Sequence, residues 1–268
     1  MSLYESLRDA VRESEPAVLV TVVVAERPGS KLLVTFDPDG AVVVEGTLGD
    51  PDLDRVVTRD SLAELAAANS GVRHYGPHGE AGEDSVSVFI ESFSPPPRMF
   101  VFGAVDFTAS LVRVAKTLGY RVIVCDAREV FATSRRFPQA DEVVVDWPHR
   151  LVERVGPTLR ATDAICVLTH DHKFDVPAIV AALRTDVGYI GAMGSRRTAE
   201  ERRRRLVEAG ATDTELARLM APTGLDIGAR SPEETAIAIC AEIISLRTGR
   251  APASLRDTDG PIHTVTTR

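Results

Sequence analysis

The chain has 268 residues, 44% of them hydrophobic, and a formal net charge of -8 at pH 7. This length suits one large domain or two ordinary ones, and the hydrophobic fraction is ample for packed cores without disulfide or metal staples. Because the phosphate backbone of nucleic acids selects basic surfaces, the negative charge argues against nucleic acid as the main partner.

The first residues, "MSLYESLRDAVRESEP", show no basic region followed by an apolar core, and no stretch reaches the roughly 18 apolar residues of a spanning helix. Cys125, Cys166 and Cys240 are far apart in apolar runs, so neither a disulfide framework nor a C-x-x-C metal site is expected. The one basic run, Arg202 to Arg205, follows two glutamates on a predicted helix, which favours a solvated face. These features predict a cytoplasmic protein without a membrane span.

Residues 1–97 are predicted to form a small α+β domain. A helix is expected around Leu3–Glu13 and a second one within 50–68. The turn sequences "RPGS" and "DPDG" separate the first three apolar runs, as in a β-meander. The expected strands occupy residues 17–25, 31–36, 41–46, 72–76 and 85–93. "SPPPR" at 94–98 closes the domain, because consecutive prolines continue neither a ladder nor a helix.

Residues 98–268 change to a rhythm of strand, helix, strand. Short apolar runs such as "MFVFGA", "RVIVCD" and "AICVLT" alternate with helical stretches such as "TASLVRVAKTLG". Fully apolar strands between helices predict a parallel sheet covered on both faces, in an α/β doubly wound, Rossmann-like domain. Such sheets bind ligands at the carboxyl ends of their strands, so the loops that follow the strands are the candidates for chemistry.

The first of these loops, in "FVFGAVDFTASLVRVAKTLGYRVIVCDAR", has the layout of a dinucleotide site. Gly103 suits the tight turn, and Asp126 ends the next strand where a ribose-binding acid normally lies. Val105 stands where a second glycine lets pyrophosphate approach the backbone, and Asp106 brings a negative charge to the helix start. Asp106 is also explained as a carboxylate that interacts with the helix dipole. Ordinary NAD binding is therefore disfavoured at this turn.

The second loop, "LTHDHKFD", brings His170, Asp171, His172 and Asp175 within six positions. Two histidines and two carboxylates suit a metal site, an acid–base site or the orientation of a bound ligand. The two histidines point the same way only if the strand continues through them, and no distant third metal ligand is evident. Plain loop polarity is the remaining interpretation.

The third loop, "YIGAMGSRRTAEE", leads from Gly191 and Gly194 into Ser195, Arg196 and Arg197. Glycines before a helix start, a hydroxyl and two guanidiniums make an anion seat, because free backbone N–H groups and arginine forks both suit phosphate. The equally weighted alternative is a helix capped by Ser195, with surface arginines.

The fourth loop contains "PTGLDIG", where two glycines and Asp226 form a compact segment able to close over a ligand. The following "SPEE" has a sufficient structural explanation, since Ser231, Pro232 and Glu234 match a capping box with proline at the first helical position.

Taken in order, several motifs of the carboxyl half closely resemble the XdhC/CoxI family, the accessory proteins of xanthine dehydrogenase and carbon monoxide dehydrogenase maturation. The matching motifs are "THDHKFD", "YIGAMGSRRT", "RLVEAG", "APTGLDIGA" and "SPEETAIAICAEI", within roughly Arg98 to Gly249. The resemblance implies a factor that binds molybdenum cofactor, the pterin dithiolene, and hands it to an apo-hydroxylase. In some members a sulfurase supplies the terminal sulfur, so the resemblance also implies a cysteine desulfurase as a further partner, as well as a homodimer.

Three segments differ from the family pattern. "VDFT" follows the Gly-Ala of the Rossmann loop where members commonly have "GHVA". "TLGDPDL" around Gly49 and "GEDSVSV" around Ser85 replace the "GGC" and "CGG" of the amino-terminal domain. A thiolate is a natural soft ligand for molybdenum, and both cysteines of the family pattern are absent here. The Rossmann loops are therefore expected to hold the pterin end of the cofactor, with its phosphate and polar edges.

The predicted function is therefore a maturation factor for a molybdenum hydroxylase, more plausibly a cofactor-insertion accessory protein than an enzyme. The alternatives are an NAD(P)-dependent oxidoreductase and a non-catalytic recruiting module. No catalytic residue and no metal ligand is assigned. The predicted cofactor-binding residues are Gly103, Asp126, His170, Asp171, His172, Gly191, Gly194, Ser195, Arg196, Arg197 and Asp226.

Overall fold

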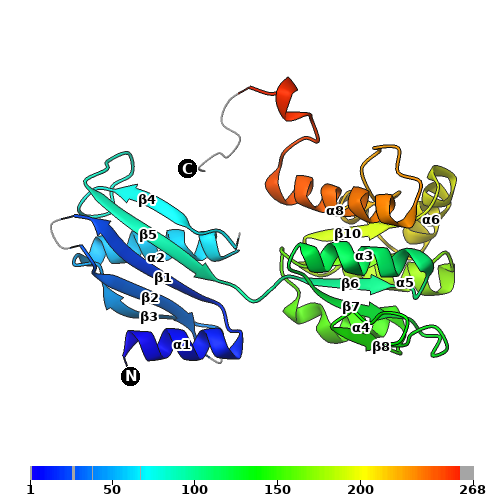
Figure 1. The fold of residues 1–268 in the computed structure, drawn as a ribbon, viewed down its shortest axis with the longest axis horizontal. Coiled ribbons are helices and arrows are strands. Elements are labelled where there is room, and N and C mark those ends of the chain that lie inside the picture. The colour runs from blue at the N-terminus through cyan, green and yellow to red at the C-terminus, as the bar shows by residue number, and fades with distance from the viewer. Residues whose placement is uncertain (1, 26–27, 38, 67, 260–268) are drawn as a thin grey trace. The chain divides into compact units, whose positions relative to one another are not determined.

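The computed structural model describes residues 2–259 except 26, 27, 38 and 67. The chain divides into two compact units, Met1–Pro96 and Pro97–Arg268. The division falls within the proline-rich connector, and each unit has its own sheet and its own hydrophobic core (Figure 1). None of the helices in the described part of the chain combines the length and hydropathy that a membrane crossing requires.

The first unit is a five-stranded antiparallel sheet in the order β3-β2-β1-β5-β4. Its helices are α1 (Leu3–Glu13) and α2 (Pro51–Ala66). Its strands are β1 (Ala17–Val24), β2 (Lys31–Phe36), β3 (Val42–Thr47), β4 (Gly71–Tyr75) and β5 (Val86–Phe93). Because β1, β2 and β3 are consecutive neighbours, the expected meander is confirmed. Ser2 and Glu5 form a capping box that starts α1, since each side chain accepts from the other residue's backbone N–H.

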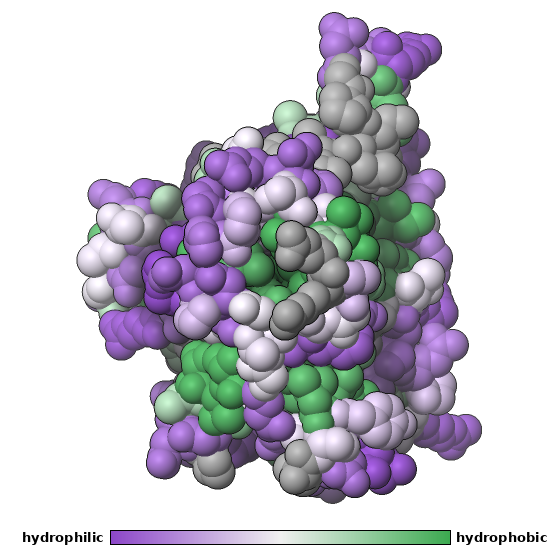
Figure 2. Space-filling model, turned by 90° about the vertical axis from the view of Figure 1, so that its left-hand side faces the viewer, coloured by the Kyte–Doolittle hydropathy of each residue, from purple (hydrophilic) through white to green (hydrophobic). Residues whose placement is uncertain are grey.

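Alternation along the strands of this sheet separates two apolar faces. Val18 and Val20 of β1 pack with Val57 of α2 in the larger core. Ala17 and Leu33 pack with Ala10 of α1 on the opposite face. Hydrophobic residues also reach the surface in separate patches among hydrophilic ones (Figure 2). On the edge strand β3, three consecutive valines, Val42 to Val44, are each more than a third exposed.

The second unit is a six-stranded parallel sheet in the order β11-β10-β9-β6-β7-β8. Its strands are β6 (Arg98–Phe102), β7 (Arg121–Cys125), β8 (Glu142–Val144), β9 (Ala164–Val167), β10 (Tyr189–Ala192) and β11 (Leu219–Met220). With β6 counted as the first strand, this is the strand order of dinucleotide-binding Rossmann folds. The predicted α/β doubly wound class is thus confirmed.

Helices cover both faces of the parallel sheet (Figure 1). The helices of one face are α3 (Asp106–Thr117) and α8 (Pro232–Thr248), which pack on Val101, Val124 and Cys166. The helices of the other face are α4 (Pro148–Val155), α5 (His172–Leu183) and α6 (Arg196–Glu208), which pack on Phe102, Cys125 and Val167. The shorter helical segments are η1 (Gly156–Thr158), α7 (Asp213–Leu216) and η2 (Leu255–Asp257). The predicted capping box of α8 is confirmed, because Ser231 Oγ accepts from Glu234 N and Pro232 occupies the first turn.

Candidate functional site at the carboxyl edge of the parallel sheet

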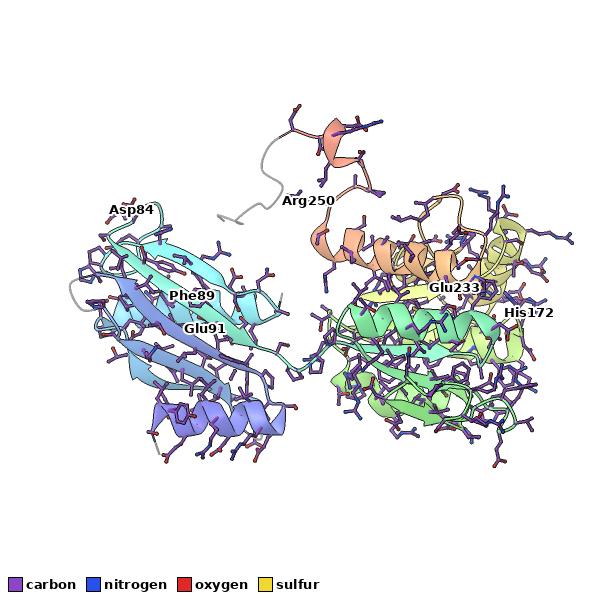
Figure 3. The ribbon with its side chains drawn as sticks, viewed as in Figure 1. Asp84, Phe89, Glu91, His172, Glu233 and Arg250 are labelled. Atoms are coloured by element: carbon purple, nitrogen blue, oxygen red, sulfur yellow. The ribbon has the colours of Figure 1, made fainter. Side chains whose placement is uncertain are left out.

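The strand order places a switch point between β6 and β9, because the connections after these strands leave in opposite directions. The loops that follow the two strands touch: a Cβ on Gly103 would lie 2.6 Å from Thr169 Cγ2. His172, after β9, and Glu233, at the start of α8, both lie at this end of the unit (Figure 3). The predicted site loops therefore gather at one edge of the sheet.

Gly103 makes the tight turn after β6. Its φ is 110°, a conformation that favours glycine, and its N–H donates to Cys125 O over 2.9 Å. Val105 is the N-cap residue of α3 and packs, partly buried, on the core of the α3 and α8 face. The side chain of Asp106 is 94% exposed, 3.8 Å from Arg136 Nη2. The two residues that depart from the dinucleotide pattern thus point to the core and to solvent respectively.

Asp126 ends β7 beside this turn, as predicted, but its carboxylate is already used within the protein. Oδ1 accepts from the backbone N and Nε of Arg128, and Oδ2 accepts from Ala104 N at 2.8 Å and Arg128 Nη2 at 2.7 Å. Burial alone would raise the pKa of Asp126, but these hydrogen bonds hold the pKa below its usual value. A ligand at this edge therefore meets the guanidinium of Arg128, whose side chain is 45% exposed.

The second loop begins after Val167, where β9 ends, so strand alternation does not extend to His170 and His172. Asp171 caps α5 instead, with its Oδ1 accepting from Lys173 N at 3.1 Å. His172 occupies the first helical position, and within the described residues its buried Nδ1 has no hydrogen-bond partner. This loop supplies a free imidazole nitrogen at a helix start. No group of three or more His, Cys, Asp or Glu among the residues described has an arrangement suited to a metal ion.

A buried polar chain connects the second loop to the third. Thr169 donates its hydroxyl to Asp175, and Arg202 Nη2 donates to Asp175 Oδ2 at 3.2 Å and to Met193 O at 2.9 Å. The side chains of Asp175 and Arg202 are both fully buried. Burial raises the pKa of Asp175 above its usual value, and the Thr169 hydrogen bond and the Arg202 charge offset this only in part. Thr169 also contacts Gly103, so this chain fixes three loops relative to one another.

The prediction that Arg202 to Arg205 form one solvated face is wrong at Arg202. The helix turns Arg202 and Leu206, four positions apart, towards the sheet, while Arg203 and Arg204 are exposed. Two nitrogens of Arg202, Nε and Nη1, have no hydrogen-bond partner in the described part of the chain. A Cβ on Gly194 would lie 3.7 Å from Nη1, so this buried cation lies directly beneath the third loop.

The third loop combines both interpretations offered by its sequence. Ser195 caps α6, with its Oγ accepting from Thr198 N at 3.1 Å. Gly194 has a φ of 152°, and a Cβ there would lie 3.2 Å from Thr198. Arg196 and Arg197 extend into solvent from the first turn of the helix. A capped helix start with two exposed guanidiniums remains compatible with a bound anion.

The fourth loop is held by a hydrogen-bond network. Tyr189 donates its hydroxyl to Glu242 Oε2 at 2.6 Å, and Gly224 N donates to the same oxygen at 2.9 Å. Gly191 leaves room for this network, because a Cβ there would lie 2.5 Å from Thr223 Oγ1 and 2.7 Å from the Tyr189 hydroxyl. Asp226 pairs with Arg196 at 3.3 Å, with both side chains largely exposed. The structure thus brings the third and fourth loops together at a solvent-facing ion pair.

All three cysteines are buried and free. Burial raises the pKa of the Cys125 and Cys240 thiols to about 12 and raises the pKa of Cys166 well above its usual value. We therefore expect the folded protein to leave a thiol reagent such as DTNB unreacted at pH 8, because no thiolate is accessible. The unfolded chain in guanidinium should react at all three. A native protein that titrates even one thiol within minutes would contradict this.

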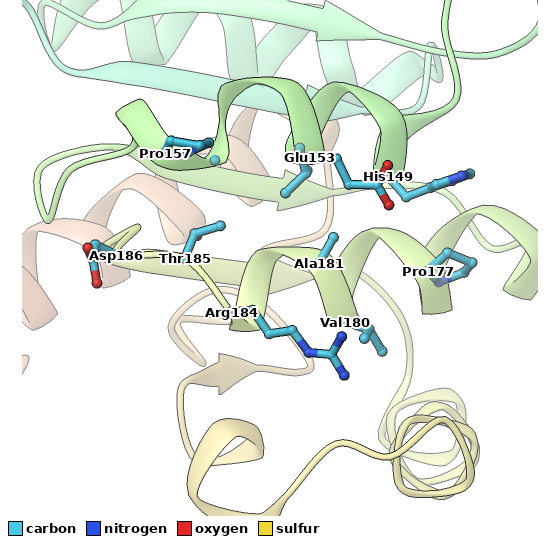
Figure 4. A pocket seen from close by; sticks show the side chains of 11 residues that line it. His149, Glu153, Pro157, Pro177, Val180, Ala181, Arg184, Thr185 and Asp186 are labelled. Carbon is cyan, nitrogen blue, oxygen red and sulfur yellow. The ribbon is translucent and has the colours of Figure 1, made fainter.

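A separate cavity of about 580 Å³ lies between α4, η1 and α5 (Figure 4). Its lining includes His149, Glu153, Pro177 and Arg184, and none of the residues predicted for cofactor binding. It is therefore distinct from the loops described above.

Comparison with known proteins agrees with this architecture. The pattern of the XdhC Rossmann domain matches residues 99–243, and that of the XdhC and CoxI family matches residues 10–76. A crystal structure of a xanthine dehydrogenase from Bacillus halodurans superposes with a TM-score of 0.55 at 23% identity, covering 95% of this chain and 98% of that one. This likeness shows a shared fold.

Two curated relatives match over a length close to that of the second unit. A probable xanthine dehydrogenase subunit of Bacillus subtilis (strain 168) is 32% identical over 165 residues, 62% of this chain and 47% of that protein. The molybdenum cofactor insertion chaperone PaoD of Escherichia coli (strain K12) is 27% identical over 160 residues, 59% of this chain and 43% of that protein. The chain thus spans less than half the length of the curated relatives it matches. Since the Rossmann-domain match alone extends over more than half of the chain, the protein belongs to the XdhC and CoxI family.

Proposed function

We propose that the protein is an accessory factor for a molybdenum hydroxylase. It carries molybdenum cofactor as cargo at the carboxyl edge of its parallel sheet and passes the cofactor to the apo-enzyme. The observation that carries this proposal is the convergence of four loops at the switch point of an XdhC Rossmann domain. Membership of the family and the name of the relative PaoD support an accessory role.

The phosphate of the molybdenum cofactor would lie at the start of α6. Gly194 and Ser195 lead into this helix, whose first-turn N–H groups and exposed Arg196 and Arg197 suit an anion. Arg202 lies directly below the loop, where it is paired with Asp175 and fixes the position of the loop through Met193 O. Asp226, which pairs with Arg196, would meet the polar edge of a ligand held between the third and fourth loops. Gly103 and Asp126 shape the neighbouring turn, while His170 to His172 flank it.

The chain's own thiols cannot hold the metal end of the cofactor, because all three are buried with raised pKa values. In this proposal a cysteine desulfurase supplies the terminal sulfur, and the hydroxylase supplies the final surroundings of the metal. A cytoplasmic location and a homodimeric assembly complete the proposal.

Anaerobic calorimetry tests this function with the full chain. Changing Arg196 and Arg197 together to Ala should weaken cofactor binding by about tenfold or more, because each removes a charge-assisted contact to phosphate. The matched control is R203A/R204A, which removes two exposed arginines about two turns further along α6. Equal affinities in the two double variants would show the phosphate seat to be wrong. Failure of the wild-type protein to bind either cofactor or an apo-hydroxylase would refute the function.

The order of the parallel strands also supports a second candidate, an NAD(P)-dependent oxidoreductase that uses the Gly103 turn. This function requires NADH to bind, so fluorescence enhancement of millimolar NADH would support it and its absence would exclude it. A protein that captures a hydroxylase subunit while binding neither cofactor would instead be a recruiting module.

A further inference from the structure

Trp147 occupies a position that capping does not explain. It is the N-cap residue of α4, three positions after β8 ends, and no side-chain hydrogen bond is made there. Ser, Thr, Asp and Asn are the residues that normally satisfy a helix start, whereas an indole ring offers no acceptor. The residue is half-buried and is the single tryptophan of the chain.

Aromatic and cationic side chains from two helix starts surround this indole. Phe174 of α5 lies 5.0 Å from the Trp147 ring centroid, and His149 lies edge-on at 5.9 Å. Lys173 Nζ lies 5.4 Å from the Trp147 centroid and 4.8 Å from that of Phe174. The first turns of α4 and α5 thus form a cluster of Trp147, His149, Lys173 and Phe174, beside the His172 that the sequence singled out.

The polar groups of this cluster are unpaired. In the described parts of the chain, no carboxylate forms an ion pair with Lys173, although it is exposed. The buried Nδ1 atoms of His149 and His172 also have no hydrogen-bond partner among those residues. Asp171, the nearest acid in sequence, is turned to the backbone N–H of Lys173. The exposed ammonium of Lys173 and the half-buried indole of Trp147 are therefore the groups of this cluster that a ligand can reach.

We propose that this cluster is a binding subsite for a flat heteroaromatic ring that bears an anionic group. The ring stacks against Trp147, and the anionic group pairs with Lys173. Indole is the best cation–π and stacking partner among side chains, and an electron-poor heterocycle complements it. The subsite rests on the proposed function, since the cofactor carries a flat pterin ring with the anionic dithiolene beside it. The subsite would receive this end of the cofactor while α6 receives the phosphate.

Titration of the full chain with pterin-6-carboxylate, monitored by Trp147 fluorescence, tests the subsite directly. The wild-type protein should show saturable quenching, since the single indole lies in the site. Lys173→Met should raise the dissociation constant by about tenfold, the value of one charge-assisted contact. The matched control is Lys116→Met, which removes a partly exposed lysine at the far end of α3 that pairs with Asp141. It should bind like the wild type.

Two outcomes overturn the subsite: no saturable quenching up to millimolar ligand, or equal dissociation constants for K173M and K116M. The proposed function is judged separately, by retention of intact molybdenum cofactor. Cofactor that is retained equally by wild type and K173M refutes the subsite and leaves the function standing. Loss of cofactor binding with normal pterin-6-carboxylate quenching refutes the function and leaves the subsite standing.

Discussion

Arg202→Met is expected to lower the free energy of unfolding of the second unit by about 3–5 kcal/mol, the cost of leaving one member of a buried ion pair without its partner. Asp175 would remain fully buried, with the Thr169 hydroxyl still donating to it but without the charge of Arg202. Urea denaturation followed by tryptophan fluorescence measures this effect, because the one tryptophan, Trp147, lies in the second unit.

The pH dependence of this variant has a definite sign. Burial already raises the pKa of Asp175, and removal of the Arg202 charge raises the pKa further. A carboxyl whose pKa is raised in the folded state lowers the free energy of unfolding when the pH is above that pKa. It has no such effect when the pH is below the pKa of the unfolded state. The deficit of R202M should therefore be complete at neutral pH and shrink as the solution is acidified. R202M/D175N should likewise recover part of the loss, since no charge is buried.

Arg204→Ala is the matched control for this prediction. It removes an arginine from the same helix whose side chain is 71% exposed and whose pairing with Glu208 is loose, at 3.8 Å. Its cost should stay below about 0.5 kcal/mol, as for exposed ion pairs. If R202M were as stable as R204A, the buried pair would not be the structural connection between the second and third loops.

Gly103→Ala should destabilise the second unit by at least about 2 kcal/mol, through a strained left-handed conformation and a steric clash, each of order 1–3 kcal/mol. The new Cβ would lie 2.6 Å from Thr169 Cγ2 and 3.1 Å from Thr169 N. Thr169→Ser removes that methyl group but keeps the hydroxyl that donates to Asp175. The double variant should therefore be less destabilised than the sum of the single changes, measured by the same urea titrations as a double-mutant cycle.

Gly119→Ala separates the two causes. Gly119 also has a positive φ, 81°, but nothing lies within 4 Å of the position of a Cβ. This variant should show only the conformational strain, of about 1 kcal/mol. Equal destabilisation of G103A and G119A, with no coupling between positions 103 and 169, would mean that the first two loops are not in tight contact.

The architecture followed from the sequence because its signals were local and repeated. Apolar runs alternating with helical stretches indicated the parallel sheet, and Ser231 to Glu234 correctly marked the start of α8. β11, with two residues, and the short helix α4 lack such signals and were not anticipated. The helix and the meander of the first unit were predicted at nearly their observed bounds.

The site was less accessible to sequence reasoning, because it depends on which way side chains turn. The pairing of Asp126 with Arg128, two residues away, uses up a carboxylate that the pattern assigned to a ligand. Arg202 was grouped with its solvated neighbours, although Leu206, four positions on, marks the buried side of that helix. Nothing in the sequence joins Trp147 to Lys173, since β9 and the approach to α5 lie between them.

The central claim is that the carboxyl edge of the second unit holds molybdenum cofactor, and native mass spectrometry of anaerobically prepared protein tests it most directly. The protein would be measured alone, with added molybdopterin and with added NADH, so that the bound ligand is identified by its mass. The account predicts a retained pterin mass in the wild type and in R203A/R204A that is lost in R196A/R197A. A retained nicotinamide mass, or no ligand under any condition, would contradict it.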